Sequence, residues 1–190
     1  MNATSLPVVF LKGRKVILRP LEDADLPSLQ RWINDEQIRL NLMAFRPMSL
    51  GGEREWYEKI QKNENHVQLA ICTLEHQLIG STGIFGINWQ HRFAQTGTII
   101  GEVEFRNKGY GTDAKMQLLN YAFNTLNLHK MCSGAFEFNE QSLHYSLKCG
   151  YQIEGRARKQ YFKDGQYCDL IQLGILREEW LPLWEAYRKG

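Results

Sequence analysis

The sequence predicts a mixed α/β fold, built on a central sheet that is antiparallel at first and has one parallel crossover in its second half. Three observations predict it. Strand patterns follow one another closely in the first half of the chain, a glycine-containing loop then separates a strand from a helical pattern, and an Asp-Gly pair lies between two β-rich arms near the end. This order of elements is typical of a sheet with helices packed on it.

The first half of the chain predicts two helices and an antiparallel meander. Asp23 opens a helix in which Leu26, Leu29, Trp32 and Ile33 form one apolar face. The expected strands are residues 16–19, 67–72, 78–87 and 94–103, and the second helix is residues 53–61. Because only short turns separate the last three strands, we expect them to pair as an antiparallel meander.

A change of hydrophobic period marks the second half. Residues 114–126 carry apolar side chains at helical spacing, with Thr112 and Asp113 in the first turn, where the helix dipole favours an acidic residue. Residues 130–138 then form a strand, which completes a strand, loop, helix and strand crossover.

The last third predicts a short helix and a hairpin. Asn139 can cap a helix that runs to Lys148, and Gly150 stands where left-handed backbone follows a helix end. The Asp-Gly pair at residues 164–165 lies between two β-rich arms, which is a strong hairpin signal.

Composition and charge narrow the class of protein. The 190 residues are most simply one domain, residues 1–190, long enough to bury a core without disulfides or a metal. The 23 Lys and Arg against 21 Asp and Glu leave a net charge of +2, so no whole-molecule field points to nucleic acid or an anionic membrane. The cysteines and histidines lack metal-ligand spacing, so no metal site is expected. Residues 6–11 are too short an apolar stretch for a signal or a membrane span, and we expect a cytoplasmic protein with reduced thiols.

The stretch FRNKGYGTDA, residues 105–114, carries the functional signal. It follows a strand and precedes a helix, so backbone N–H groups of residues 106–111 can point at one anion, helped by the positive end of the helix. Gly109 and Gly111 let the backbone approach a phosphate closely, and Arg106 and Lys108 add positive charge. A plain glycine-containing turn, a dinucleotide site and an acyl-CoA site all fit this spacing.

A dinucleotide site fits the rest of the chain less well. Gly109, Gly111 and Ala114 match the G-x-G-x-x-G/A pattern, but that pattern belongs after the first strand of a parallel sheet, with an acidic residue at the end of the second strand. Here an antiparallel meander precedes the loop, and the strand after the helix opens with the sequence KMC. An acyl-CoA is the better candidate, because its pyrophosphate also needs converging backbone N–H groups.

Several motifs together resemble the GNAT N-acetyltransferases. Arg106-x-x-Gly109-x-Gly111 is similar to the R/Q-x-x-G-x-G/A motif of that superfamily. The segment NEQS at 139–142, followed by CGY at 149–151, is similar to its N-x-x-S/A and L-G-F segments. LRPLEDADL, WINDEQIR and KDGQYCDLIQLGILREEW resemble the RimJ/RimL branch, although sugar-nucleotide amine acetyltransferases resemble EFNEQS and KDGQYCDL too. The resemblance runs from about residue 14 to residue 180 and implies a GNAT fold.

The resemblance implies transfer of an acetyl group from acetyl-CoA to a primary amine, by direct attack in a ternary complex. It implies that the pantetheine arm lies where the strand ending at Ile99, Ile100 and Gly101 separates from the next one, and that backbone N–H groups there hold the oxyanion. Asn139 would bind the pantetheine amides, unless it only caps its helix, and Lys148 would bind a CoA phosphate, unless it is only solvated. The pyrophosphate would lie on Arg106, Asn107, Lys108, Gly109, Tyr110, Gly111 and Thr112.

The groups expected to transfer protons depart from the family pattern. Where many relatives carry a glutamate in A-E-x-G, this chain has Gln95, which cannot act as a base. Where many carry a tyrosine as the acid, it has Ser146, with Tyr145 one position earlier and about 100° round the helix. Ser142, at a position where RimL-like proteins have serine, is the donor we favour, unless it only caps the helix.

The acceptor amine is the least specified part of the prediction. An α-amine with a pKa of about 7.8 is roughly a quarter neutral near physiological pH, whereas a lysine-type amine of about 10.4 is only about 0.1% neutral. A site with a weak base therefore favours an amine of low pKa, such as a peptide N-terminus or an amino sugar. The RimJ/RimL resemblance implies a protein or peptide N-terminus of the ribosomal-protein type. The alternative acceptors are small amines, namely amino sugar nucleotides, polyamines and aminoglycosides.

Two further expectations concern the class of function and the assembly. Because Gln95 and Ser146 both depart from the pattern, a catalytically silent acetyl-CoA-binding protein stays open as a second class of function. Specificity is expected in the loops at residues 40–52 and 87–93, and a homodimer is possible because dimers are the commonest soluble oligomers.

Overall fold

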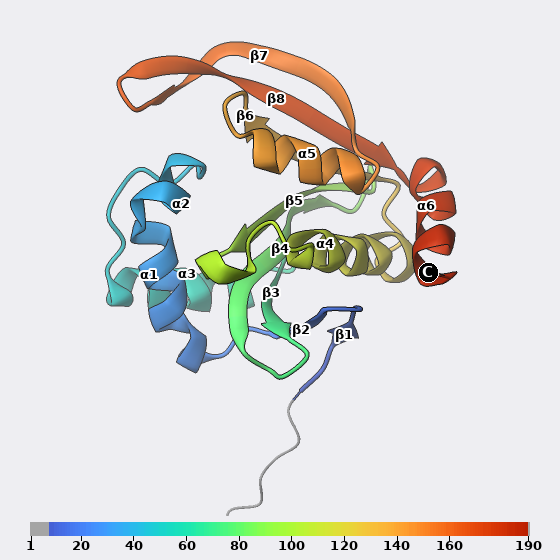
Figure 1. Ribbon diagram of the computed structural model, residues 1–190, viewed down its shortest axis with the longest axis horizontal. Helices are drawn as coiled ribbons and strands as arrows, with labels where there is room; N and C mark the ends of the chain where they lie inside the picture. Colours follow the sequence, from blue (N-terminus) through green and yellow to red (C-terminus); the bar gives the residue numbers. More distant parts are fainter. Residues whose placement is uncertain (1–7, 190) are drawn as a thin grey trace, which may run out of the picture.

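Eight strands in the described part of the chain form one mixed sheet, and helices cover both of its faces (Figure 1). The computed structural model describes residues 8–189. Its strands are β1 (Leu11–Lys12), β2 (Val16–Pro20), β3 (His66–Thr73), β4 (Leu78–Asn88), β5 (Phe93–Ile100), β6 (Lys130–Phe136), β7 (Gln152–Lys163) and β8 (Gln166–Leu176). Its α-helices are α1 (Leu26–Asn34), α2 (Glu36–Leu40), α3 (Leu50–Gln61), α4 (Tyr110–Asn120), α5 (Glu140–Lys148) and α6 (Arg177–Lys189).

The sheet separates in its middle, between β5 and β6. The order is β1-β2-β3-β4-β5-β6-β8-β7, and all neighbours are antiparallel except β5 and β6, which are parallel. The parallel pair is short, since residues 93–95 lie opposite residues 130–132 and the ladder ends there. Thr96 is thus the first residue of β5 beyond the ladder, and the two strands diverge from this point. We call this divergence of β5 and β6 the splay.

Side chains on the two faces of the sheet enter two separate apolar cores. One core packs α4, α5 and α6 against sheet residues that include Ala94. The other packs α1, α2 and α3 against the opposite face, where Ile99 lies against a cluster that contains Trp32. Because side chains alternate along a strand, β5 presents Thr96 to α4 and Gln95 to the face of the first three helices.

The fold class expected from the sequence is confirmed, but several boundaries differ. The strand expected over residues 94–103 ends at Ile100, because the chain enters a 3₁₀ turn at Val103–Phe105. The helix expected to have Thr112 and Asp113 in its first turn begins slightly earlier, at Tyr110, directly after Gly109, whose left-handed backbone ends the loop. The last turn expected for that helix is a π-helical turn at Tyr121–Thr125.

Other differences come from weak local signals. The helix expected over residues 53–61 begins at Leu50, where the Ser49 hydroxyl caps it by accepting the N–H of Gly52. The earlier start was not predicted because the two glycines at 51–52 have a low helix propensity. A 3₁₀ turn at Asp23–Asp25 precedes α1. The sequence analysis assigned no element to β1, α2 or α6; β1 and α2 are very short. None of the helices within residues 8–189 is both long and apolar enough to cross a membrane.

Candidate active site

The loop between β5 and α4 presents a row of free backbone N–H groups. Asn107 and Gly109 both have positive φ angles, 59° and 87°, which turn the chain so that neighbouring N–H groups converge. Within residues 8–189, the N–H groups of residues 107–112 have no hydrogen-bond partner. Together with the N-terminal end of α4 they form a site suited to a pyrophosphate, which we call the cradle.

The Arg106 side chain holds the cradle in shape. Its Nε donates to the carbonyl oxygen of Ile100 at 3.0 Å, and its Nη2 donates to that of Gly101 at 2.8 Å. These bonds satisfy two carbonyl groups at the end of β5 and tie that strand to the loop. Arg106 was expected to add charge toward a phosphate; its guanidinium instead supports the backbone that would bind one.

A lysine from the turn between β1 and β2 brings a positive charge to the cradle. The Lys15 ammonium donates to the carbonyl oxygen of Lys108 at 2.8 Å, on an exposed side of the loop. The Asp113 carboxylate fixes this turn, because it accepts the N–H groups of Arg14, Lys15 and Val16 at 3.2, 2.7 and 3.0 Å. Lys15 was not predicted from the sequence, because nothing local in the sequence links it to the loop.

The end of β5 directs part of its backbone into the splay. The Gly101 N–H donates to the carbonyl oxygen of Ile79 at 2.9 Å, so it is not available to a ligand. Gly101 packs so closely on Trp32 that a Cβ would lie 2.0 Å from the indole. Because hydrogen-bonding directions alternate along an antiparallel strand, the N–H groups of Thr98 and Ile100 point away from β4 and into the splay. Ile100 therefore has the geometry expected of an oxyanion donor.

The three hydroxyl groups expected to serve as proton donors differ in accessibility. Ser146 is fully buried, and its Oγ has no hydrogen-bond partner within residues 8–189. Ser142 is partly exposed in the first turn of α5, where its N–H donates to Asn139 Oδ1 at 3.1 Å. Tyr145 is partly exposed and packs on the core that includes α4. Asn139 does cap α5, and Ser146 is sealed away from any ligand.

A buried lysine lies beneath the start of the splay. Lys115 is 0% exposed, and its ammonium donates to the Thr96 hydroxyl at 2.6 Å. The same hydroxyl lies 2.9 Å from the Tyr151 hydroxyl, and the ammonium is 5.4 Å from the ring centres of Tyr145 and Tyr151. Burial disfavours the charged form of Lys115, but the two phenol groups favour it and leave the pKa of this ammonium raised. Burial raises the pKa of Tyr151 to about 12, and Lys115 opposes that shift.

Lys115 was also missed by the sequence analysis, although a signal for it existed. It lies on the same helical face as Leu118, Leu119 and Ala122, which belong to the apolar core. A lysine inside an apolar stripe is a buried charge, and such charges are uncommon unless they have a partner or a task.

No carboxylate stands where the family pattern has its base. Gln95 is exposed on β5, opposite Phe85 and Cys132 on the neighbouring strands. Glu102 lies just beyond the end of β5, but Arg31 forms an ion pair with it and Trp32 Nε1 donates to it at 3.3 Å. Glu104, two residues further on, is exposed and forms no ion pair within residues 8–189.

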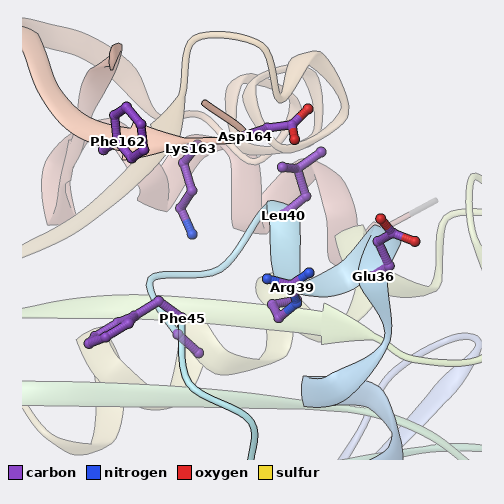
Figure 2. A pocket seen from close by; sticks show the side chains of 8 residues that line it. Glu36, Arg39, Leu40, Phe45, Phe162, Lys163 and Asp164 are labelled. Atoms are coloured by element: carbon purple, nitrogen blue, oxygen red, sulfur yellow. The ribbon is translucent and has the colours of Figure 1, made fainter. Parts of the chain in front are cut away.

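A small cavity lies between α2 and the tip of the β7–β8 hairpin (Figure 2). Its volume is about 200 Å³, and Glu36, Arg39, Phe45, Phe162 and Lys163 are among the residues that line it. In Figure 2 the Lys163 side chain extends from the hairpin toward the segment after α2, where its ammonium donates to the carbonyl oxygen of Leu42. Burial lowers the pKa of Lys163. The cavity joins one of the loops expected to carry specificity to the hairpin.

The comparison with known families agrees with this geometry. The sequence profile of the acetyltransferase (GNAT) domain matches residues 15–152, which is most of the chain. The chain belongs to the GNAT acetyltransferase family. This GNAT protein is accordingly an acetyl-CoA-dependent N-acetyltransferase, and the expected cosubstrate is confirmed. Within residues 8–189 no three His, Cys, Asp or Glu side chains are grouped to hold a metal ion.

Individual relatives of this GNAT protein cover almost its whole length. The spermidine N(1)-acetyltransferase of Vibrio cholerae serotype O1 is 29% identical over 171 residues, which are 88% of this chain and 96% of that protein. The putative ribosomal N-acetyltransferase YdaF of Bacillus subtilis is 28% identical over 172 residues, 87% of this chain and 93% of that one. A crystal structure of the V. cholerae spermidine N-acetyltransferase in complex with CoA and spermine has a TM-score of 0.83 at 28% identity, covering 87% of this chain and 98% of that one.

Proposed function

We propose that this acetyltransferase transfers the acetyl group of acetyl-CoA to a primary amine of a small polyamine, such as spermidine. The observation that carries the proposal is the likeness to spermidine N-acetyltransferases, which extends over nearly the whole of their length in both sequence and fold. A protein N-terminus is the acceptor expected from the sequence, with polyamines as an alternative; the relatives support the alternative better. The RimJ/RimL branch and the homodimer stay predictions.

The absence of a carboxylate at residue 95 is compatible with a polyamine acceptor. Like charges disfavour one another, so each ammonium of a polyamine lowers the pKa of its neighbours. A bound polyamine therefore offers a neutral amine more readily than an isolated lysine does.

The proposed reaction uses the groups that the splay brings together. The neutral amine nitrogen attacks the acetyl carbonyl carbon, the C–S bond breaks, and the sulfur leaves with the bonding electrons. The N–H of Ile100 donates to the carbonyl oxygen as negative charge develops there. The amine proton passes to solvent, because Gln95 cannot accept it, and the sulfur takes a proton from a hydroxyl of α5. Ser146 is sealed in the core, and we place Tyr145 ahead of Ser142, the donor favoured from the sequence, because the Tyr145 ring centre lies 5.4 Å from the Lys115 ammonium.

A panel of acceptors tests the proposal. The purified protein is incubated with acetyl-CoA and, separately, with spermidine, spermine, N-terminal peptides, amino sugars or aminoglycosides, and products are identified by mass spectrometry. We expect an added acetyl group on the polyamines, with kcat/KM at least about tenfold above that of any peptide. Acetylation of peptides alone would restore the N-terminal interpretation. Binding of acetyl-CoA without any product would favour the catalytically silent class.

A further inference from the structure

We propose that Lys115 is a positioning residue for acetyl transfer, which acts through Tyr145 on the departing sulfur of CoA. The inference rests on the acetyl transfer itself and on the choice of Tyr145 as donor in the proposed function, not on the identity of the amine.

Lys115 is a buried charge without an opposite charge. Its side chain is 0% exposed and forms no ion pair within residues 8–189; its hydrogen bond in this region is to the Thr96 hydroxyl. The groups that face it are the phenols of Tyr145 and Tyr151 and the thiol of Cys149. Removing an ammonium from water is costly unless it is paired, so its retention in an apolar stripe needs a reason.

The position of Lys115 supplies that reason. Thr96, which accepts its hydrogen bond, is the first residue of β5 beyond the parallel ladder, and Ser133 Oγ of β6 lies within 3.4 Å of the Thr96 carbonyl oxygen. The ammonium therefore lies directly below the point where the strands diverge and the thioester is expected. Figure 1 shows α4 and α5 side by side over this part of the sheet, and the thiol of Cys149, the residue after α5, donates to the carbonyl oxygen of Thr112 in α4 at 3.9 Å.

Tyr145 connects the buried ammonium to the splay. Unlike Ser146, it is partly exposed, and its ring centre lies 5.4 Å from the Lys115 ammonium. When the C–S bond breaks, the sulfur receives the electron pair and takes the proton of the Tyr145 hydroxyl, which leaves a phenolate. The ammonium stabilises that transient negative charge inside a region of low dielectric constant, and solvent then returns a proton to the phenolate. Atoms and charge balance without any further reactant.

Replacing Lys115 distinguishes a purely structural role from a role in catalysis, because the two roles predict opposite effects on stability and turnover. Lys115→Met keeps the length and volume of the side chain and removes a desolvated charge, and such changes are often neutral or stabilising. Thr96 and Tyr151 retain their mutual hydrogen bond, so no hydroxyl is orphaned. If the lysine held the fold together, the variant would lose stability. If it positions charge for catalysis, the variant keeps its stability and loses turnover.

A double-mutant cycle tests the link to Tyr145. Lys115→Met, Tyr145→Phe and the double variant are compared with wild type, with Lys62→Met as a matched change at an exposed lysine on the end of α3. We expect kcat to fall about tenfold in Lys115→Met and about a hundredfold in Tyr145→Phe, with KM for acetyl-CoA and Tm within error of wild type. The double variant is expected to be no slower than Tyr145→Phe, because one residue acts through the other. Independent, multiplying losses, or a lower Tm with unchanged kcat in Lys115→Met, would overturn the inference.

A binding measurement keeps this test separate from the choice of acceptor. CoA and desulfo-CoA, which lacks the sulfur, are titrated into wild type and Lys115→Met at pH 8.5, with no amine present. We expect wild type to bind CoA more tightly than desulfo-CoA. In Lys115→Met the ratio of the two Kd values should shrink at least about fivefold, because the ammonium no longer supports negative charge near the sulfur. An unchanged preference would contradict the role of Lys115 even if polyamines prove to be the acceptors. A lost preference would support it even if they do not.

Discussion

Lys15 and Gln95 are two residues of the candidate site whose surroundings are formed by segments far away in the sequence. Lys15 reaches the cradle only because Asp113 of α4 holds the turn between β1 and β2 by three N–H bonds. Gln95 faces the first three helices because of its place in the alternation of β5. Each residue gives a prediction that isolates one side of the reaction.

Replacing Lys15 should weaken cosubstrate binding without affecting the fold. The ammonium has donors to spare after its bond to the Lys108 carbonyl, and a phosphate on the cradle would lie beside it. We expect Lys15→Ala to raise the Kd for acetyl-CoA about three- to tenfold at low salt, and the difference to shrink with added salt, because the site is exposed. Isothermal titration measures it, with Lys12→Ala on the neighbouring strand as control. An equal Kd for wild type and Lys15→Ala would remove Lys15 from the site.

Gln95 gives a prediction about pH. With the proposed polyamine as acceptor and no carboxylate base, the enzyme must capture the small neutral fraction of the amine, and this fraction rises about tenfold per pH unit while the pH stays below the amine pKa. We therefore expect kcat/KM for spermidine to rise steadily between pH 6 and pH 9. Gln95→Glu should flatten that rise by supplying a proton acceptor. A plateau in the wild-type profile near neutrality would mean that another group serves as base.

At the scale of elements, the helices and strands that could be predicted are those that a short stretch of sequence identifies by itself. The cradle, α4 and the β7–β8 hairpin were foreseen because glycines, helical spacing and the Asp-Gly pair mark them directly. The splay at Thr96 followed only from the family resemblance, since the point where pairing stops depends on two strands that are far apart in sequence. The contact of Lys15 with Lys108 leaves no mark on either segment alone. The apolar stripe around Lys115 does indicate a buried lysine, but nothing in that segment identifies Thr96 as its partner.

Helix α3 contains a buried acid whose effect depends on pH. Glu53 is 3% exposed, forms no ion pair within residues 8–189, and burial raises its pKa. A carboxyl with a folded-state pKa above its unfolded value favours the fold only when protonated, so its charged form destabilises the protein at neutral pH. We expect Glu53→Gln to raise Tm by about 2–4 °C at pH 7. The gain should vanish as pH falls through the folded pKa toward the unfolded value of about 4.3. Thermal unfolding monitored at both pH values checks the sign, and a gain that persists at low pH would contradict it.

At the scale of the whole molecule, the two faces of the sheet carry different helices. The cradle, α4 and α5 lie with one core, and α1, α2 and α3 lie with the other, so the splay opens between two differently packed faces. Asp113 joins distant parts of the first face. Besides the three N–H groups of the β1–β2 turn, its carboxylate accepts the hydroxyl of Tyr187 from α6. A Cβ on Gly13 would lie 2.4 Å from this carboxylate, so the turn is packed tightly on it.

The last prediction follows from that junction. Asp113→Ala leaves three N–H groups of the turn without their acceptor, at a cost of about 3 kcal/mol or more, and should lower Tm by about 6–12 °C. It should also weaken acetyl-CoA binding by as much as Lys15→Ala does, because Lys15 is no longer held at the cradle. Tyr187→Phe removes one bond of the same carboxylate and should cost about 1 kcal/mol while leaving the Kd unchanged. Thermal unfolding and titration of the same preparations give both readouts. If Tyr187→Phe weakened binding as much as Asp113→Ala, α6 rather than the β1–β2 turn would be the element through which Asp113 supports the cradle.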